Sequence, residues 1–235
     1  MTTLMIDAGP AADDALVSRT GGVPLAPAGT SWPTCATCGG PLQFLAQLLL
    51  ADLAGRGDLA GSGEPGRSLL ALFACQNDPG MCDDWEPDSG GNLALLLPVD
   101  GLQPIPRPEP ADAANDENAD EDGDEDEEDD VLGLGATRAV ELCRMTEPDY
   151  YDARTEWAER TGRPVTEILG QLGGTPDWLQ GDETPGCPDY AQPMPLAVQL
   201  EPGPDHLTAM NFGDGGNGYG FACEPCGRAT FLWQC

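Results

Sequence analysis

An acidic tract divides the chain into two parts. Between Glu109 and Asp130 the sequence holds 14 Asp or Glu residues and no basic residue. Such a segment buries little apolar surface and its charges repel one another, so we expect it to be solvated and disordered. Four prolines between 104 and 110 predict an extended lead-in, which places the insert at 104–130. The tract is either a solubilising linker or an acidic arm for a basic partner.

Acidic residues also exceed basic residues outside the tract. The chain has 41 acidic and 10 basic residues and a formal net charge of −31, of which −17 remains when the tract is left out. All ten basic residues are arginines. Affinity for a phosphate backbone comes mainly from Lys and Arg, so direct binding of nucleic acid is not expected. A basic protein is the more suitable partner.

Glycine and proline together account for 54 of the 235 residues, which disfavours long helices. Short apolar or alternating runs are bounded by Gly, Pro or Asp, as is typical of strands in antiparallel sheets. We therefore predict a β-rich α+β fold. The predicted strands cover residues 42–49, 68–74, 92–98, 136–145, 196–201, 207–212, 219–223 and 229–234.

One or two helices are expected to pack between the sheet units. Thr146 and Asp149 form a capping-box pattern, and apolar residues then recur at helical spacing as far as Gly162. A second, shorter helix is predicted over 165–172, because it follows Pro164 and stops at two glycines.

The same order of motifs occurs on both sides of the acidic tract. Each side has Gly-Gly-x-Pro, from Gly21 or Gly173, then a cysteine, a Pro-Leu strand that contains Gln, a strand ending in Ala-Cys, and a further cysteine near a Trp. This shared order predicts two pseudo-repeated antiparallel-sheet units that arose by duplication. The expected parts are an N-terminal segment (1–20), a first unit (21–103), the insert (104–130), and a helical linker with the second unit (131–235).

The sequence favours a cytoplasmic protein. Its first 20 residues lack a basic region followed by an apolar one, so no signal peptide is expected. The longest apolar run, 41–53, is too short for a membrane span and is interrupted by Gln. In a reducing compartment, nine cysteines at grouped spacings indicate metal binding before disulfides.

Four cysteines of the first unit are spaced as the ligands of a structural zinc ion. Cys35 and Cys38 form a C-x2-C knuckle, and Cys75 and Cys82 are joined by a turn that can bring their sulfurs together. Structural zinc requires four thiolate or imidazole ligands in a tetrahedron. The alternatives are buried free thiols or a redox pair.

A second zinc site is predicted less strongly in the second unit. Its candidate ligands are Cys187, Cys223, Cys226 and Cys235, of which the last is the final residue of the chain. Cys143 lies in a predicted strand and is expected in the core. The only histidine, His206, lies in a predicted loop and is expected to be exposed rather than a ligand.

Enzyme chemistry has little support in the sequence. A thiol or hydroxyl nucleophile needs a base to activate it, and the chain has one His and no Lys. A zinc ion closed by four thiolates has no open position for water. Acid pairs such as Asp83–Asp84 and Asp182–Glu183 are not distinguished from solvated surface. We therefore expect no enzymatic activity.

Several segments resemble two related groups of proteins. LGGTPDWLQGDE, PLQFLAQLLLADL and FGDGGNGY resemble the bacterial YwqG-like family of unknown function, whose members carry G-G-x-P, P-L-x-F-L-x-Q, G-x-P-x-x-x-Q-x-D and G-D-x-G motifs. The cysteine pairs of the first unit and the strand at 41–47 resemble programmed cell death protein 2 and its relatives. The resemblance covers roughly residues 20–100 and 165–235.

The eukaryotic relatives imply a binding role, since they resemble dedicated chaperones that hold a basic ribosomal protein before assembly. An acidic chain is physically suited to such a client. Our leading hypothesis is a non-enzymatic, zinc-stabilised binding protein that holds a basic protein partner. The alternatives are an immunity-type inhibitor of a basic toxin and, less favoured, an enzyme that uses paired carboxylates.

Overall fold

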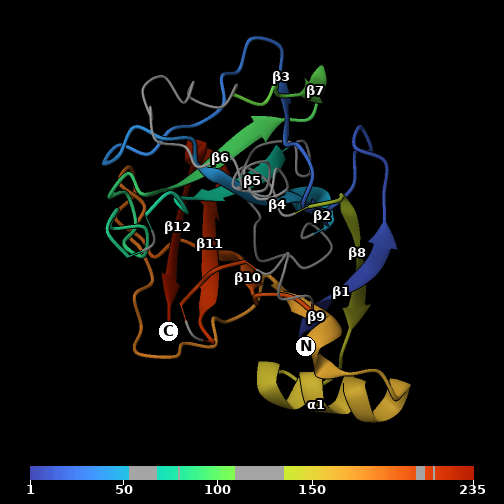
Figure 1. Cartoon of the computed structure of the whole chain (residues 1–235). Helices are drawn as coiled ribbons and strands as arrows, with labels where there is room; N and C mark the ends of the chain where they lie inside the picture. Colours follow the sequence, from blue (N-terminus) through green and yellow to red (C-terminus); the bar gives the residue numbers. More distant parts are fainter. Residues whose placement is uncertain (53–67, 79, 109–134, 205–209, 214) are drawn as a thin grey trace, which may run out of the picture.

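Ten strands form one antiparallel sheet in the order β12-β11-β10-β9-β1-β8-β2-β4-β5-β6 (Figure 1). The structure is a computed structural model that describes residues 1–52, 68–78, 80–108, 135–204, 210–213 and 215–235. The acidic tract and His206 lie outside these residues. The strands are β1 (Thr3–Pro10), β2 (Arg19–Thr20), β4 (Gln43–Leu49), β5 (Ser68–Ala74), β6 (Asn92–Pro98), β8 (Arg138–Arg144), β9 (Ile168–Leu172), β10 (Leu196–Leu200), β11 (Asn217–Cys223) and β12 (Arg228–Gln234). A separate pair consists of β3 (Leu25–Pro27) and β7 (Leu102–Pro104).

The strand order is symmetric about the centre of the sheet. The strands at matching distances from the two edges are β6 and β12, β5 and β11, β4 and β10, β2 and β9, and β8 and β1. In each of these pairs one strand comes from the first half of the chain and its counterpart from the second half. We call β2, β4, β5 and β6 the first wing, and β9, β10, β11 and β12 the second wing. The predicted units do not form separate sheets, because β1 pairs with β8 and β9, and β8 also pairs with β2.

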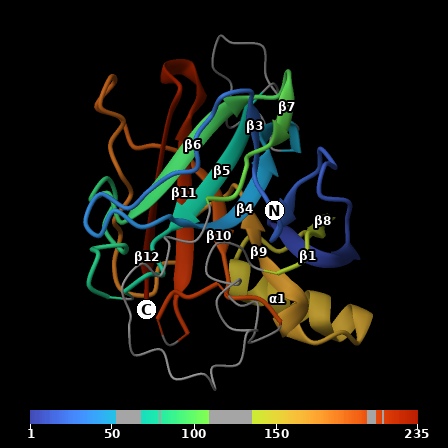
Figure 2. The same ribbon diagram turned by 45° about the horizontal axis from the view of Figure 1, so that its top comes forward.

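The sheet curls until its two edge strands, β6 and β12, lie side by side and nearly close it (Figure 2). Within the described residues the ladder of paired strands does not continue across this seam. The loop before β6 bridges the seam instead. Trp233 donates its backbone N–H to the carbonyl of Trp85 at 3.2 Å, and Thr230 donates its hydroxyl to Asp88 at 3.2 Å.

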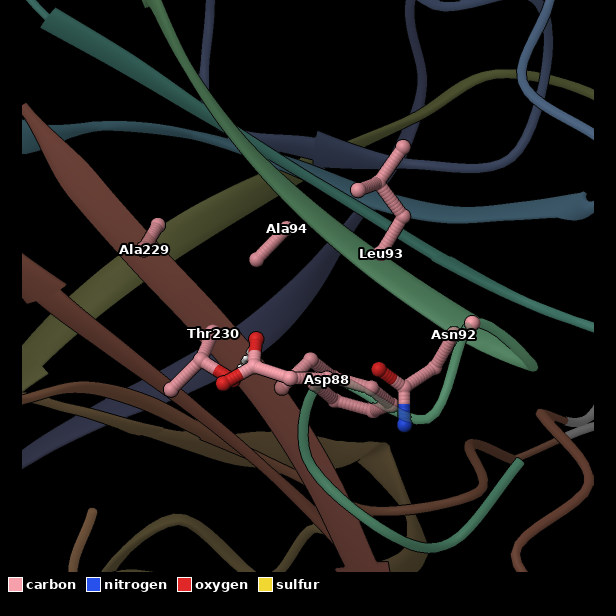
Figure 3. Close-up of a pocket in the computed structure, with 8 residues that line it drawn as sticks. Asp88, Asn92, Leu93, Ala94, Ala229 and Thr230 are labelled. Atoms are coloured by element: carbon pink, nitrogen blue, oxygen red, sulfur yellow. Dashed lines mark hydrogen bonds between the residues drawn. The ribbon is translucent and has the colours of Figure 1, made fainter. Parts of the chain in front are cut away.

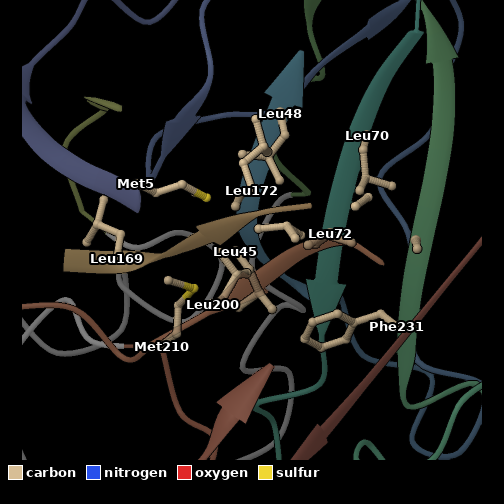
Figure 4. Packing of buried hydrophobic residues seen from close by; sticks show 14 of the residues in the cluster. Met5, Leu45, Leu48, Leu70, Leu72, Leu169, Leu172, Leu200, Met210 and Phe231 are labelled. Atoms are coloured by element: carbon tan, nitrogen blue, oxygen red, sulfur yellow. The ribbon is translucent and has the colours of Figure 1, made fainter. Parts of the chain in front are cut away.

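The main core fills the space inside the curled sheet. Leu45 and Leu72 of the first wing pack there with Leu200 and Phe231 of the second (Figure 4). The outer face of each wing carries its own smaller apolar cluster. Strands such as β5 and β11 are therefore buried on both faces. This explains why the sequence of β5 is a continuous apolar run rather than an alternating one.

The predicted first helix is confirmed as α1 (Tyr150–Thr161), which lies beneath the central strands (Figure 1). Its N-cap is Asp149 and not Thr146, because the Asp149 carboxylate accepts a 3.0 Å hydrogen bond from the backbone N–H of Asp152. Gly162 ends the helix at a φ of 69°. Trp157 and other apolar residues of α1 pack against the outer side of β1.

The prediction of a second helix over 165–172 is wrong. Only Val165–Glu167 form a short 3₁₀ turn, and the remaining residues form β9, which pairs with β1 and β10. All five residues of β9 are buried, so this segment has no polar face to expose as a packing helix would. A Cβ at Gly170 would collide with the carbonyl oxygen of Gln199, which shows how closely β9 and β10 approach.

Residues 1–20 take part in the sheet, because β1 lies in its centre and β2 between β8 and β4. Residues 210–212, predicted as the end of a strand, are not in one. Among the described residues no helix combines the length and the apolar character needed to cross a membrane.

Candidate metal centres

The structure brings the four cysteines of the first unit together on the outer face of the first wing. Cys35 and Cys38 lie on the loop before β4, and Cys75 and Cys82 lie beyond the end of β5. Their sulfurs all lie within 4.8 Å of one another. A tetrahedral zinc site with Zn–S bonds of about 2.3 Å separates its sulfurs by about 3.8 Å. The Sγ atoms of Cys38 and Cys75 are 3.8 Å apart, so this cluster can hold a metal ion.

Backbone hydrogen bonds fix the shape of the first knuckle. Cys35 donates its N–H to the carbonyl of Gly40 at 2.8 Å, and Gly39 donates its N–H to the carbonyl of Cys35 at 2.9 Å. The φ of Gly39 is 74°, a conformation that favours glycine and turns the chain back towards β4. Asn77 points its side-chain amide at the sulfurs of Cys38 and Cys75, at 3.4 and 3.3 Å.

Three sulfurs of the cluster are buried and one faces solvent. Cys35, Cys75 and Cys82 are at most 2% exposed, whereas Cys38 is exposed. A hydrogen bond from the backbone of Gly40 is the main cause that lowers the pKa of Cys38 to about 7, while burial raises the pKa of Cys75 and Cys82. A bound cation would stabilise all four as thiolates.

The second cluster contains three cysteines. Cys187, Cys223 and Cys226 place their sulfurs within 4.8 Å of one another on the outer face of the second wing, with the Sγ atoms of Cys187 and Cys226 3.3 Å apart. Burial raises the pKa of Cys226 to about 12. Burial also acts to raise the pKa of Cys187, but hydrogen bonds, of which the largest is with Cys226, outweigh it and lower that pKa. This cluster can also hold a metal ion.

The loop of the second cluster has the same hydrogen bonds as the first knuckle. Cys187 donates its N–H to the carbonyl of Gln192 at 2.8 Å, and Ala191 donates its N–H to Cys187 at 2.7 Å. Ala191 has a φ of 52°, so it takes the left-handed conformation of Gly39. Counting along this matched loop, Tyr190 stands where the first knuckle has its exposed cysteine.

The other predicted site residues lie elsewhere. Cys235 is exposed and is not one of the three clustered cysteines; its sulfur lies near Gly213. Cys143 lies in β8 as predicted, half-buried against the helix, with its sulfur 3.8 Å from that of Met145. All nine cysteines fall within the described residues, and all nine are free.

The two acid pairs singled out in the sequence do not act as pairs in the structure. Asp84 is buried and accepts a 3.2 Å hydrogen bond from the indole of Trp233, and burial raises its pKa. Asp182 accepts from the backbone and hydroxyl of Thr184, whereas Glu183 accepts from Gln234. Asp84 thus supports the seam, and Asp182 closes a turn.

A buried polar cluster at the start of α1 has no signal in the sequence. Tyr150 donates its hydroxyl to Glu201 at 2.7 Å, and Arg154 forms an ion pair with the same carboxylate oxygen at 2.7 Å. Burial raises the pKa of Glu201, an effect that Arg154 opposes. Some 50 residues separate the partners, so no local motif indicates the cluster. Its contacts attach α1 to the end of β10.

A cavity of about 220 Å³ lies at the seam between β6 and β12 (Figure 3). It is lined by Leu93, Ala94 and Phe231, with Asp88 as its one carboxylate. Asp88 accepts a hydrogen bond from the Thr230 hydroxyl. The cavity therefore does not have the two facing carboxylates that the enzyme hypothesis requires.

A family model matches part of the chain. Residues 18–96 match the model of a domain of unknown function, DUF1963. This region covers the first cysteine cluster and the strands of the first wing, except for the last two residues of β6. No curated protein matches the chain. The match supports an uncharacterised domain family, and the relation to YwqG-like proteins and to programmed cell death protein 2 stays a prediction.

Proposed function

We propose that the chain is a non-enzymatic, zinc-stabilised binding protein that holds a basic protein partner. The proposal is carried by the closed four-cysteine cluster in a chain of net charge −31. The cluster supplies stability without an open reactive position, and the charge supplies attraction for a cationic surface.

Zinc fits the first cluster best among the common metals. Four thiolates are soft ligands, and a tetrahedral set of four sulfurs is typical of zinc or iron–sulfur sites. One ion of zinc needs only the four sulfurs already present. Because three of the four are buried in the apolar cluster of the first wing, loss of the ion would leave polar groups in that cluster.

We also infer that the two wings arose by duplication of one unit. Gln47 of β4 accepts the backbone N–H of Leu25 at 3.1 Å, and Gln199 of β10 accepts that of Asp177 at 2.9 Å. Each acceptor lies 22 residues after its donor and each donor follows a Gly-Gly-x-Pro motif. The matched strand order and the matched cysteine loops agree with the same correspondence.

Retention of a partner from extract of the source cells tests the binding proposal. Immobilised full-length protein should retain a basic protein at low salt and release it at moderate salt, because screening weakens contacts between exposed charges. A variant that lacks residues 109–130 shows whether the acidic tract acts as an arm. Absence of any enriched basic protein would contradict the proposal.

Elemental analysis of protein purified without added metal tests the zinc. We expect the Cys75→Ser variant to lose one zinc ion per chain relative to the unaltered protein. Cys143→Ser is the matched control, because that cysteine is outside both clusters and should leave the zinc content unchanged. If the purified protein contains no zinc, the proposed structural zinc is contradicted.

A further inference from the structure

We propose that Cys187, Cys223 and Cys226 form a second zinc site with one open coordination position, which accepts a neutral imidazole-type donor from outside the chain. The first cluster is closed by its own fourth cysteine, whereas the second has three. The inference rests on the second cluster alone and stands or falls separately from the basic partner.

The missing ligand follows from the match between the two loops. Both loops carry the same pair of backbone hydrogen bonds, so the residue before Gly39 in one corresponds to the residue before Ala191 in the other. The first is Cys38 and the second is Tyr190. The oxygen of a phenol lies much further from the backbone than a cysteine sulfur does, so Tyr190 does not supply the equivalent donor atom.

The open position faces solvent. In the first cluster the exposed member is Cys38, which covers three buried sulfurs. Its counterpart Tyr190 is 56% exposed, whereas Cys187 and Cys223 are buried and Cys226 is partly exposed. A ligand from solution can therefore approach from the side on which the first cluster places its own fourth sulfur.

No fourth ligand is supplied by the described residues. The group of described His, Cys, Asp and Glu side chains that meet here holds the three cysteines only. Cys235 lies near Gly213, away from this group. The carboxylate of Asp189 faces Arg228, at 3.8 Å.

Charge favours a neutral donor over an anionic one. Three thiolates around Zn²⁺ already give a net charge of −1, and the neighbouring loops carry the carboxylates of Asp189 and Glu224. A further thiolate or carboxylate would add another negative charge to a chain of net charge −31. An imidazole nitrogen is a common zinc ligand and adds no charge.

Cobalt(II) spectroscopy on the full-length chain tests the open position, because the visible d–d bands of Co²⁺ report its ligands. The protein is loaded with Co²⁺ and titrated with imidazole. We expect two ions per chain and a change in the spectrum that saturates with imidazole. The Cys226→Ser variant should bind one ion and show no change, since its first cluster is intact.

Two further variants isolate the cause. Tyr190→Cys should still bind two ions but lose the response to imidazole, because its second cluster is closed like the first. His206→Gln removes the only imidazole of the chain and should respond to added imidazole as the unaltered protein does.

Three results would overturn the inference. One is that the unaltered protein binds a single ion, which the Cys226→Ser variant still binds and the Cys75→Ser variant does not. Another is a two-ion spectrum that imidazole leaves unchanged. The third is a disulfide between Cys187 and Cys226 in protein purified under reducing conditions, detected by counting free thiols. Loss of the ion from the first cluster alone would contradict the proposed structural zinc and leave this inference standing.

Discussion

The two cysteine clusters occupy corresponding places in the two wings and differ in one exposed residue. Where the first has Cys38, the second has Tyr190, although the loop around each keeps the same backbone hydrogen bonds. The backbone frame is therefore not set by a full set of metal ligands. In the proposed assignment, one change at this solvent-facing position separates a closed site from an open one.

The polar contacts under the two Gly-Gly-x-Pro turns show the same pattern. In the first wing the side chain of Arg19 donates to the carbonyl of Val23, and in the second Gln171 donates to the carbonyl of Thr175 at 2.9 Å. Arg19 is fully buried, and burial lowers its pKa. The backbone shared by the two Gly-Gly-x-Pro turns is thus compatible with a charged or a neutral side-chain donor, provided that the carbonyl of Val23 or Thr175 receives a hydrogen bond.

The largest effect is expected from removal of one ligand in each cluster. A structural zinc ion contributes on the order of 10 kcal/mol of apparent binding free energy, so Cys75→Ser should lower the free energy of unfolding by about 4 kcal/mol or more in the presence of zinc. Cys223→Ser, in the open cluster, should cost about 2 kcal/mol. Urea denaturation measures both.

A chelator is the control for this pair of variants. If the difference arises from zinc, it should largely disappear when zinc is removed from all proteins, because each then has only thiols or a hydroxyl at these positions. Equal losses for the two variants in zinc would mean that the clusters do not differ as closed and open sites.

Replacement of the buried glutamines should give the next largest effect. Gln47→Leu leaves the backbone N–H and carbonyl of Leu25 without partners, so we expect a loss of about 3 kcal/mol in the free energy of unfolding. Gln199→Leu leaves fewer groups unpaired and should cost about 2 kcal/mol. Gln103→Leu, at an exposed position, is the control.

An outcome in which Gln199→Leu is as stable as the control would break the proposed correspondence between the wings. Denaturation curves with unchanged slopes are needed for the comparison, since a changed slope would mean that a variant alters more than stability.

Substitution of Arg19 tests whether the first wing tolerates the neutral donor that the second wing has at the corresponding position. Arg19→Gln places the residue type of Gln171 under the first turn and should retain a donor to Val23, so we expect a loss of about 1 kcal/mol. Arg19→Leu leaves the carbonyls of Asp13 and Val23 without this donor and should cost about 3 kcal/mol. Thermal unfolding ranks the two variants, and the reverse ranking would contradict the shared frame.

The sequence reveals most where one local rule decides the outcome. β5 and β6 begin and end where predicted, because each is an apolar run of strand length with turn residues at its ends. The first cysteine cluster is also predictable, since a knuckle and a second close pair each lie next to a predicted strand. β9 is mistaken for a helix because Pro164 and Gly173 are typical helix boundaries, while its pairing with β1 depends on residues more than 150 positions away.

The proposed open position of the second cluster could not be predicted in the same way. Cys235 has a plausible place in the sequence pattern, and only the matched loop hydrogen bonds align Tyr190 with Cys38. The attachment of α1 through Glu201 depends likewise on a contact between distant residues.

The smallest effect on stability is expected from replacement of Glu201. This residue also distinguishes the two wings, because the corresponding residue of the first wing is Leu49. Burial raises the pKa of Glu201, so its ionisation opposes folding. Its favourable contribution is complete below the ordinary pKa of a glutamate, about 4.3, and is lost as the pH rises through the raised value. Glu201→Gln keeps an acceptor for Tyr150 and does not ionise.

We therefore expect the stability of the unaltered protein to fall relative to that of Glu201→Gln as the pH rises above about 4.3, by about 1 kcal/mol or less. Chemical denaturation of both proteins at each pH gives the difference, in which contributions common to both proteins, including metal binding, cancel. Glu156→Gln, on the exposed side of α1, is the control. A difference that grows in the opposite direction would mean that the ion pair with Arg154 outweighs burial, so that the second wing gains from a buried charge at a site where the first wing has leucine.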